Sequence, residues 1–122
     1  MKNLVSWFEI PMSDFGRAVS FYKSVLDLDI RQTEMFGTKM GLFPSDGSNV
    51  SGALVQGEGY EPSKEGVSIY LNGGKDLTVP LNKVEKAGGT IVVPKTEISK
   101  EMGFFAIFLD TEGNKIAFHS QN

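Results

Sequence analysis

The sequence contains no cysteine, and it has a single histidine, a single tryptophan and no long apolar run. The missing thiols exclude disulfide bonds, cysteine-ligated zinc, iron–sulfur clusters and cysteine nucleophiles. No segment approaches the roughly 18 apolar residues of a membrane span, and residues 1–7 contain no signal-peptide core. We therefore expect a cytoplasmic protein that does not interact with membranes.

Positive charge is also scarce. The 122 residues include 12 lysines and arginines against 15 aspartates and glutamates, which gives a formal net charge of −3. Because no basic run offers a footprint for a phosphate backbone, we expect no nucleic-acid partner. Apolar residues make up 40% of the chain and include nine phenylalanines, enough to fill one core. The composition predicts a single domain over residues 1–122.

The first half of the chain predicts a strand, a helix and three further strands. An apolar run over 4–10 stops at Pro11 and is typical of a buried strand. Apolar residues three and four apart over 15–26 predict an amphipathic helix that Ser13 or Asp14 can cap. Three strand-like segments follow, at 30–35, 39–43 and 51–56.

The second half repeats this order after a loop-like segment, 59–65, that separates module one (1–58) from module two (66–122). A strand is expected over 67–71, a helix over 77–87 that ends at Gly88-Gly89, and strands over 90–93, 104–109 and 115–119. A constant offset of 62 residues aligns the halves, for example Asp14-Phe15 with Asp76-Leu77. Such a duplication leaves a cleft between two related sheets, where ligand pockets are favoured.

Several short motifs, taken in order, resemble the vicinal oxygen chelate superfamily, which includes glyoxalase I, bleomycin-resistance proteins and extradiol dioxygenases. They are Phe8-Glu9-Ile10-Pro11, Asp14, Arg17-Ala18, Phe21-Tyr22, Val25-Leu26, Gly88-Gly89, Val93-Pro94-Lys95, Gly103-Phe104-Phe105-Ala106, Asp110 and Gly113-Asn114. The resemblance implies an α+β, glyoxalase-like fold in which two tandem βαβββ modules form a cupped mixed sheet. It also implies a homodimer and a small-molecule ligand in the cup.

The resemblance further implies where a divalent metal would bind. Its ligands lie seven residues before the aspartate that opens each helix, and three residues after the asparagine of an Asp-x-x-Gly-Asn turn. These positions are Trp7, Ile69 and Ala117, with Val55 added by the repeat offset. None offers an imidazole, carboxylate or thiolate. We therefore expect no cofactor there, although a divalent metal held at displaced positions is not excluded, and we expect these residues to line a ligand pocket.

Two ionisable residues are candidates for acid–base chemistry in the same cup. Side chains alternate along a strand, so Glu9 shares a face with Trp7, and His119 shares one with Ala117. A Glu9–His119 pair could move a proton near neutral pH. The alternatives are a strand-edge carboxylate that reaches solvent or a backbone amide, and a solvated histidine near the C-terminus.

The remaining candidates have equally plain structural explanations. Trp7 and Tyr70 could stack on a planar or apolar ligand, or serve as core aromatics. The segment 95–102 could be a mobile flap over the cup or an ordinary solvated loop.

Four functions remain open from the sequence. The leading one is metal-independent binding of a small organic molecule. The others are a lyase or isomerase related to lactoylglutathione lyase, using Glu9 and His119 or a displaced metal site, a drug-sequestering resistance protein, and an interaction module with a collapsed cup.

Overall fold

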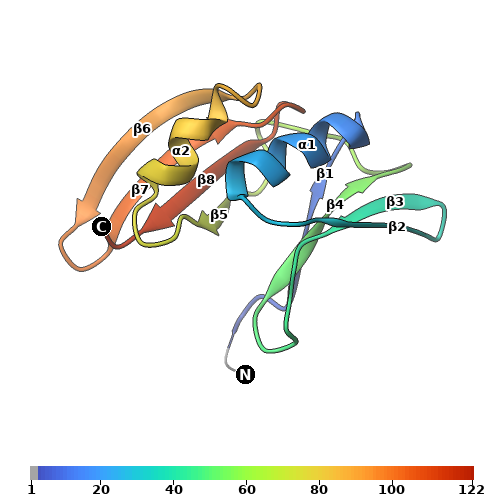
Figure 1. Cartoon of the computed structure of the whole chain (residues 1–122), viewed down its shortest axis with the longest axis horizontal. Helices are drawn as coiled ribbons and strands as arrows, with labels where there is room; N and C mark the ends of the chain where they lie inside the picture. Colours follow the sequence, from blue (N-terminus) through green and yellow to red (C-terminus); the bar gives the residue numbers. More distant parts are fainter. Residues whose placement is uncertain (1–2) are drawn as a thin grey trace.

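The computed structural model describes residues 3–122 and shows two modules with the same order of elements (Figure 1). Module one contains β1 (Trp7–Pro11), α1 (Phe15–Leu26), β2 (Arg31–Met35), β3 (Thr38–Leu42) and β4 (Ser51–Gln56). Module two contains β5 (Ile69–Asn72), α2 (Thr78–Val84), β6 (Thr90–Ser99), β7 (Gly103–Leu109) and β8 (Lys115–Ser120). Within residues 3–122, neither helix is long and apolar enough to cross a lipid bilayer.

Each module folds into one four-stranded mixed sheet. The strand orders are β1-β4-β3-β2 and β5-β8-β7-β6. The first strand of each module pairs in parallel with the last, and the other pairs are antiparallel. This confirms the predicted α+β fold of two βαβββ modules. It also makes β1 and β5 edge strands.

Helix α1 forms where its periodicity predicts it. Asp14 caps its first turn, because its Oδ1 accepts a hydrogen bond from the backbone N–H of Arg17 at 3.1 Å. Asp27 ends the helix in the left-handed conformation, with φ 53°. The buried face combines one stripe of apolar side chains, namely Phe15, Ala18, Val19, Phe21, Tyr22 and Val25.

One apolar core joins the two modules. Helices α1 and α2 lie next to each other, and the two sheets extend away from them (Figure 1). The inner faces of both sheets pack on these helices, so Ile10 and Leu54 of module one share a core with Phe108 and Phe118 of module two. Neither helix found in residues 3–122 lies on the opposite, outer face of either sheet (Figure 1).

Three predicted boundaries differ from those of the structure by three residues or more. The first strand begins at Trp7 rather than residue 4, because Leu4 is exposed and packs on nothing that would hold it in a sheet. Helix α2 ends at Val84 rather than residue 87. Strand β6 runs through Pro94 to Ser99, so most of the segment expected as a flap or loop is paired with β7. Pro94 fits because β6 is an edge strand whose register shifts between Val93 and Thr96.

The constant repeat offset holds for the helices but fails for the first strand of each module. Leu77 and Leu81 of module two are buried where Phe15 and Val19 are buried in module one. On β5, however, the residues that pack on the core are Ile69 and Leu71, which lie 61 residues after Phe8 and Ile10. A turn at Gly73-Gly74, with φ 82° at Gly74, accommodates the extra residue before α2. The one-residue step turns Ile69 toward the core instead of the outer face.

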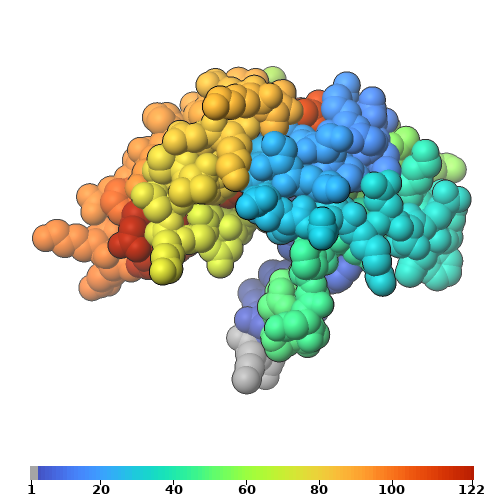
Figure 2. Space-filling model, in the orientation of Figure 1, coloured from blue at the N-terminus to red at the C-terminus, as the bar shows by residue number. Residues whose placement is uncertain are grey.

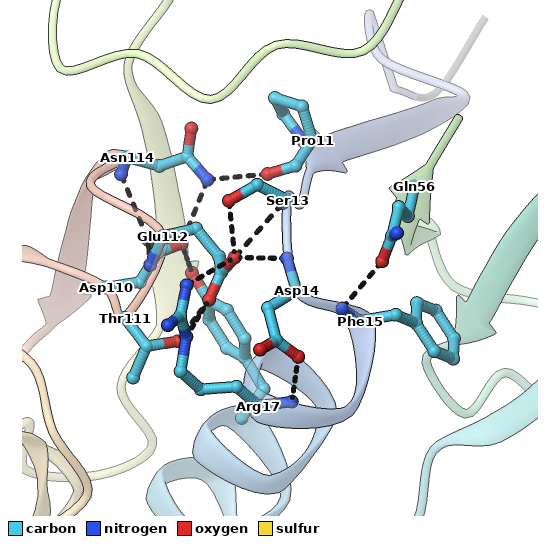
Figure 3. A network of polar contacts seen from close by, with 11 residues as sticks. Pro11, Ser13, Asp14, Phe15, Arg17, Gln56, Asp110, Thr111, Glu112 and Asn114 are labelled. Carbon is cyan, nitrogen blue, oxygen red and sulfur yellow. Dashed lines mark hydrogen bonds and ion pairs between the residues drawn. The ribbon is translucent and has the colours of Figure 1, made fainter. Parts of the chain in front are cut away.

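A polar cluster in the β7–β8 turn, which we call the inter-module latch, fastens module two to the start of α1 (Figure 3). The latch consists of Asp110, Glu112 and Asn114. Glu112 Oε1 accepts hydrogen bonds from the backbone N–H groups of Ser13 at 3.0 Å and Asp14 at 2.7 Å. Its Oε2 accepts from Arg17 Nε at 2.8 Å, and the Glu112 side chain has 0% exposure. Glu112 therefore accepts hydrogen bonds from amides at the start of α1 and also forms an ion pair with Arg17.

The other latch residues fix the helix and the first strand. The buried Tyr22 hydroxyl donates to Asp110 Oδ2 at 2.7 Å, and burial, followed by the Asp110 charge, raises the pKa of Tyr22 well above its usual value. Asn114 Nδ2 donates to the Pro11 carbonyl at 2.8 Å. The latch thus connects β1 and α1 of module one to the last turn of module two.

Stability should depend on the charge of Glu112. Burial alone would raise the pKa of Glu112, but hydrogen bonds from Arg17, from the Asp14 amide and from neighbouring hydroxyls lower it to about 2, below its ordinary 4.5. A carboxylate whose pKa is lower in the folded than in the unfolded protein stabilises the fold at a pH above its unfolded pKa. This stabilisation is lost as the pH falls toward its folded pKa. We expect Glu112→Gln to lower the free energy of unfolding at pH 7 by on the order of 2 kcal/mol.

The measurement is urea unfolding of both proteins between pH 7 and pH 3. The difference between wild type and Glu112→Gln should shrink below about pH 4.5, as the wild-type carboxylate becomes able to protonate on unfolding. Glu58→Gln, which removes an exposed carboxylate, serves as the matched control and should change little. A Glu112→Gln difference that stays constant across this range would contradict the assignment.

Candidate ligand-binding cleft

An apolar cleft of about 920 Å³ opens between the two modules. Figure 2 shows the hollow beneath α1, between the yellow segment around β5 and the green arm of the β3–β4 loop. Side chains of both modules form its apolar wall, namely Phe8, Leu26, Leu28, Phe43, Ile69 and Leu71. Its polar residues are Glu9, Asn49, Ser51, Ser68, Tyr70 and Asn72.

The apolar wall of the cleft is continuous with the hydrophobic core and reaches the protein surface. Each side chain of its apolar wall is partly buried and packs on the central cluster. The wall stays open because β1 and β5 are the edge strands of separate sheets. Covering such a surface with an apolar molecule is favourable by about 25 cal/mol for each Å² removed from water. The arrangement is suited to a small molecule with a large apolar surface.

Glu9 is the one charged residue that borders the cleft among the residues described, and its side chain shares the outer face of β1 with Trp7. Its Oε2 accepts a hydrogen bond from Trp7 Nε1 at 3.3 Å, and its Oε1 accepts one from the Tyr60 hydroxyl at 3.1 Å. The hydrogen bond to Glu9 and the charge of Glu9 raise the pKa of Tyr60. Tyr60 could not be predicted as a partner of Glu9 from the sequence, because the contact spans 51 residues.

His119 lies in a second cavity, of about 700 Å³, on module two. Its Nε2 is 2.6 Å from the Met102 carbonyl oxygen, so that nitrogen is the donor of the pair. Tyr70 and Asn72 line both this cavity and the cleft. Glu9 and His119 lie on strands of different sheets, β1 and β8, and each side chain has other hydrogen-bond partners, so their expected pairing stays a prediction. Their chemical roles stay predictions.

The four positions expected to surround a metal do not all lie on the same face of the sheets. Trp7 is 45% exposed on the outer face of the first sheet, whereas Val55 and Ala117 are buried. Ile69 packs on the core and is the only one of the four on the cleft wall in the described part of the chain. The register pairs Ala117 with Tyr70, which is 55% exposed and therefore shares the outer face.

These residues do not fit the divalent metal that the fold implies. Zinc, manganese and iron sites need three or four imidazole, carboxylate or thiolate donors that converge. Across residues 3–122, no group of three histidine, cysteine, aspartate or glutamate side chains is placed to hold a metal ion. The outer-face alternatives in module two, Ser68 and Tyr70, add no such donor. We therefore assign no step to a metal.

Comparisons with solved structures agree with the fold. A glyoxalase I variant from Zea mays has a TM-score of 0.75 and 17% identity, over 94% of this chain but 46% of its own. A glyoxylase/bleomycin resistance protein/dioxygenase domain from Frankia sp. EAN1pec has a TM-score of 0.75 and 17% identity over 100% of both chains. An antibiotic-binding protein from Streptomyces sp. CB03234 has a TM-score of 0.70 and 20% identity, over 100% of this chain and 99% of its own.

The chain thus spans about half the length of the maize enzyme and the whole length of the other two proteins. A search of curated protein sequences found no match. The sequence model of one family matches residues 4–118, which is nearly the entire chain. The protein therefore belongs to the Glyoxalase/Bleomycin resistance protein/Dioxygenase superfamily.

Proposed function

We propose that this protein binds a small, mostly apolar organic molecule in the inter-module cleft without the help of a metal. The observation that carries the proposal is the cleft itself, whose wall combines six partly buried apolar side chains from both modules. A pocket of about 920 Å³ is within the range typical of sites for drug-sized molecules.

The family adds support of a different kind. One structural neighbour of the same length is an antibiotic-binding protein, and another is a glyoxylase/bleomycin resistance protein/dioxygenase domain. Binding without turnover needs only a shaped apolar wall and a few polar contacts, which the cleft supplies. Sequestration of a toxic compound is the form of this function that the neighbours favour.

Narrowing the cleft should weaken binding. Leu28 is partly buried and belongs to the apolar wall, so Leu28→Trp adds a bulky ring system at that surface. We expect the affinity for the neutral apolar dye Nile red, measured by its fluorescence, to fall by about tenfold or more, because the indole occupies the space of the ligand.

Ser24→Trp is the matched control, because Ser24 is exposed on α1 and does not line the cleft. It should leave the affinity unchanged. Absence of saturable dye binding to the wild type would contradict the proposed function, and so would equal binding by Leu28→Trp and the wild type.

Metal independence has its own test. A ligand that binds the native state at a hundred times its Kd stabilises it by about 2.7 kcal/mol, which raises the melting temperature measurably. We expect the melting temperature to be the same with Mg²⁺, Mn²⁺, Ni²⁺ or Zn²⁺ as with EDTA. The affinity for the dye should also be the same with metal and with EDTA. An increase that EDTA reverses, together with stoichiometric metal in the purified protein, would overturn this part of the proposal.

Three further expectations belong to the proposal. Homodimer assembly is supported by the uncovered outer faces of both sheets, which carry the exposed aromatics Trp7 and Tyr70. A cytoplasmic location stays a prediction. Catalysis by Glu9 and His119 also stays a prediction, and no contact between the two side chains favours it over binding.

A further inference from the structure

We propose that strand β2 forms an antiparallel pair with β2 of a second copy of this chain, which joins the first sheets of the two copies edge to edge. The contact surface is the free edge of β2 together with Phe36 at the tip of the β2–β3 hairpin. This surface lies outside the cleft and is separate from the outer faces of the sheets, so the inference does not depend on the ligand proposed above.

The first argument is that β2 is the sheet edge with the least protection against pairing. Edge strands present unpaired backbone groups, which proteins usually protect with proline, irregular register or short length. Three of the four edges within residues 3–122 have such a feature: β1 ends at Pro11, β5 has four residues, and β6 contains Pro94 and register shifts. Strand β2 contains no proline and has a regular register against β3. Its free edge can therefore accept another strand.

The second argument is the residue at the hairpin tip, which extends away from both helices (Figure 1). Phe36 is 101% exposed and has φ 53°, a left-handed conformation that asparagine and glycine adopt more easily than phenylalanine. Such backbone strain is retained where something compensates for it. Nothing within the described residues packs on the Phe36 ring, so the compensating contact has to come from another molecule.

The third argument is that symmetry and charge together select one register. A two-fold axis perpendicular to the sheet relates two antiparallel copies of one strand, so a residue can face only a residue on the same side of the sheet. A pair centred on Arg31 would bring two arginines together, and one centred on Glu34 would bring two glutamates together. A pair centred on Gln32 would leave Glu34 and Met35 without a partner in β2. Only a pair centred on Thr33 avoids these problems and uses the whole strand.

This register also explains the exposed tip. It places Thr33 opposite Thr33 of the partner subunit and, twice by symmetry, Gln32 opposite Glu34 of the partner subunit. It places Phe36 next to Ile30 of the partner subunit, which precedes β2 and is 7% exposed at the margin of the core. The ring of one copy would thus cover the end of the core of the other.

Charge substitutions at Gln32 test the register in the full-length protein. Gln32 is exposed and pairs with Gly41 in its own sheet, so a charge there has no charged residue directly opposite within the chain. Sedimentation velocity over a concentration series should show self-association about fivefold weaker in Gln32→Glu and about fivefold stronger in Gln32→Lys, because each new charge meets Glu34 of the other copy. Asn82→Glu and Asn82→Lys, on the exposed face of α2, are the matched controls and should leave association unchanged.

Phe36→Asn separates association from folding. Asparagine adopts the left-handed conformation more easily, so the melting temperature of the dilute protein should stay the same or rise. Self-association should weaken about fivefold or more, because the ring no longer covers the partner. A lower melting temperature with unchanged association would show that Phe36 acts within its own chain and would contradict the inference.

Cross-linking gives the register directly, because the chain has no cysteine. Thr33→Cys should form an intermolecular disulfide under mild oxidation, since opposite residues have Cα atoms about 4.5–5.5 Å apart. Gln32→Cys should cross-link to Glu34→Cys, when the two are mixed, faster than either variant does to itself. Ser24→Cys, on the exposed face of α1, is the control and should stay monomeric.

The outcomes separate this contact from other modes of assembly. A protein that stays monomeric, or one whose association does not respond to the Gln32 and Phe36 variants, would overturn the inference. The second result would leave association through the outer faces, and binding of Nile red in the cleft, as they stand. If the outer faces also associate, the β2 contact would appear as a step from dimer to tetramer, and the same variants should shift that step.

Discussion

The carboxylate of Glu112, buried against the start of α1, is the contact on which the arrangement of the modules depends. It accepts from the backbone of Ser13 and Asp14 and from Arg17, while Tyr22 and Asn114 complete the latch around Asp110. Because a residue of module two accepts hydrogen bonds from amides at the start of α1, this helix cannot rotate freely relative to module two. The cleft takes its width from this constraint, since β1 leads directly into the helix that Glu112 holds.

Polar and apolar contacts contribute differently to the structure. The core that α1 and α2 share supplies most of the burial, but apolar contacts are non-directional and would tolerate other angles between the sheets. The latch adds direction, because its hydrogen bonds have defined donors and acceptors. The cleft wall is formed mainly by apolar side chains, which provide area for a ligand without fixing its direction.

The sequence predicted the features that depend on local spacing. The apolar stripe of α1 and the strands beside it were placed within a few residues, since periodicity is a property of neighbours in the chain. The prediction failed where one extra residue reverses the direction of the side chains of a strand. The extra residue at Gly73-Gly74 turns Ile69 toward the core, and the 62-residue offset that aligns the two helices does not reveal it. Tyr60 and Glu112 were missed as partners because each acts on a residue far away in sequence.

The position of Glu112 in the chain also orders the events of synthesis. Helix α1 emerges early from the ribosome, but the carboxylate that accepts from the Asp14 amide is encoded 98 residues after Asp14. Contacts of such long sequence separation slow folding, because the ends of a long loop must first meet. In nascent chains that end before the β7–β8 turn, α1 has its own cap at Asp14, but the Ser13 and Asp14 amides lack the acceptor that connects them to module two.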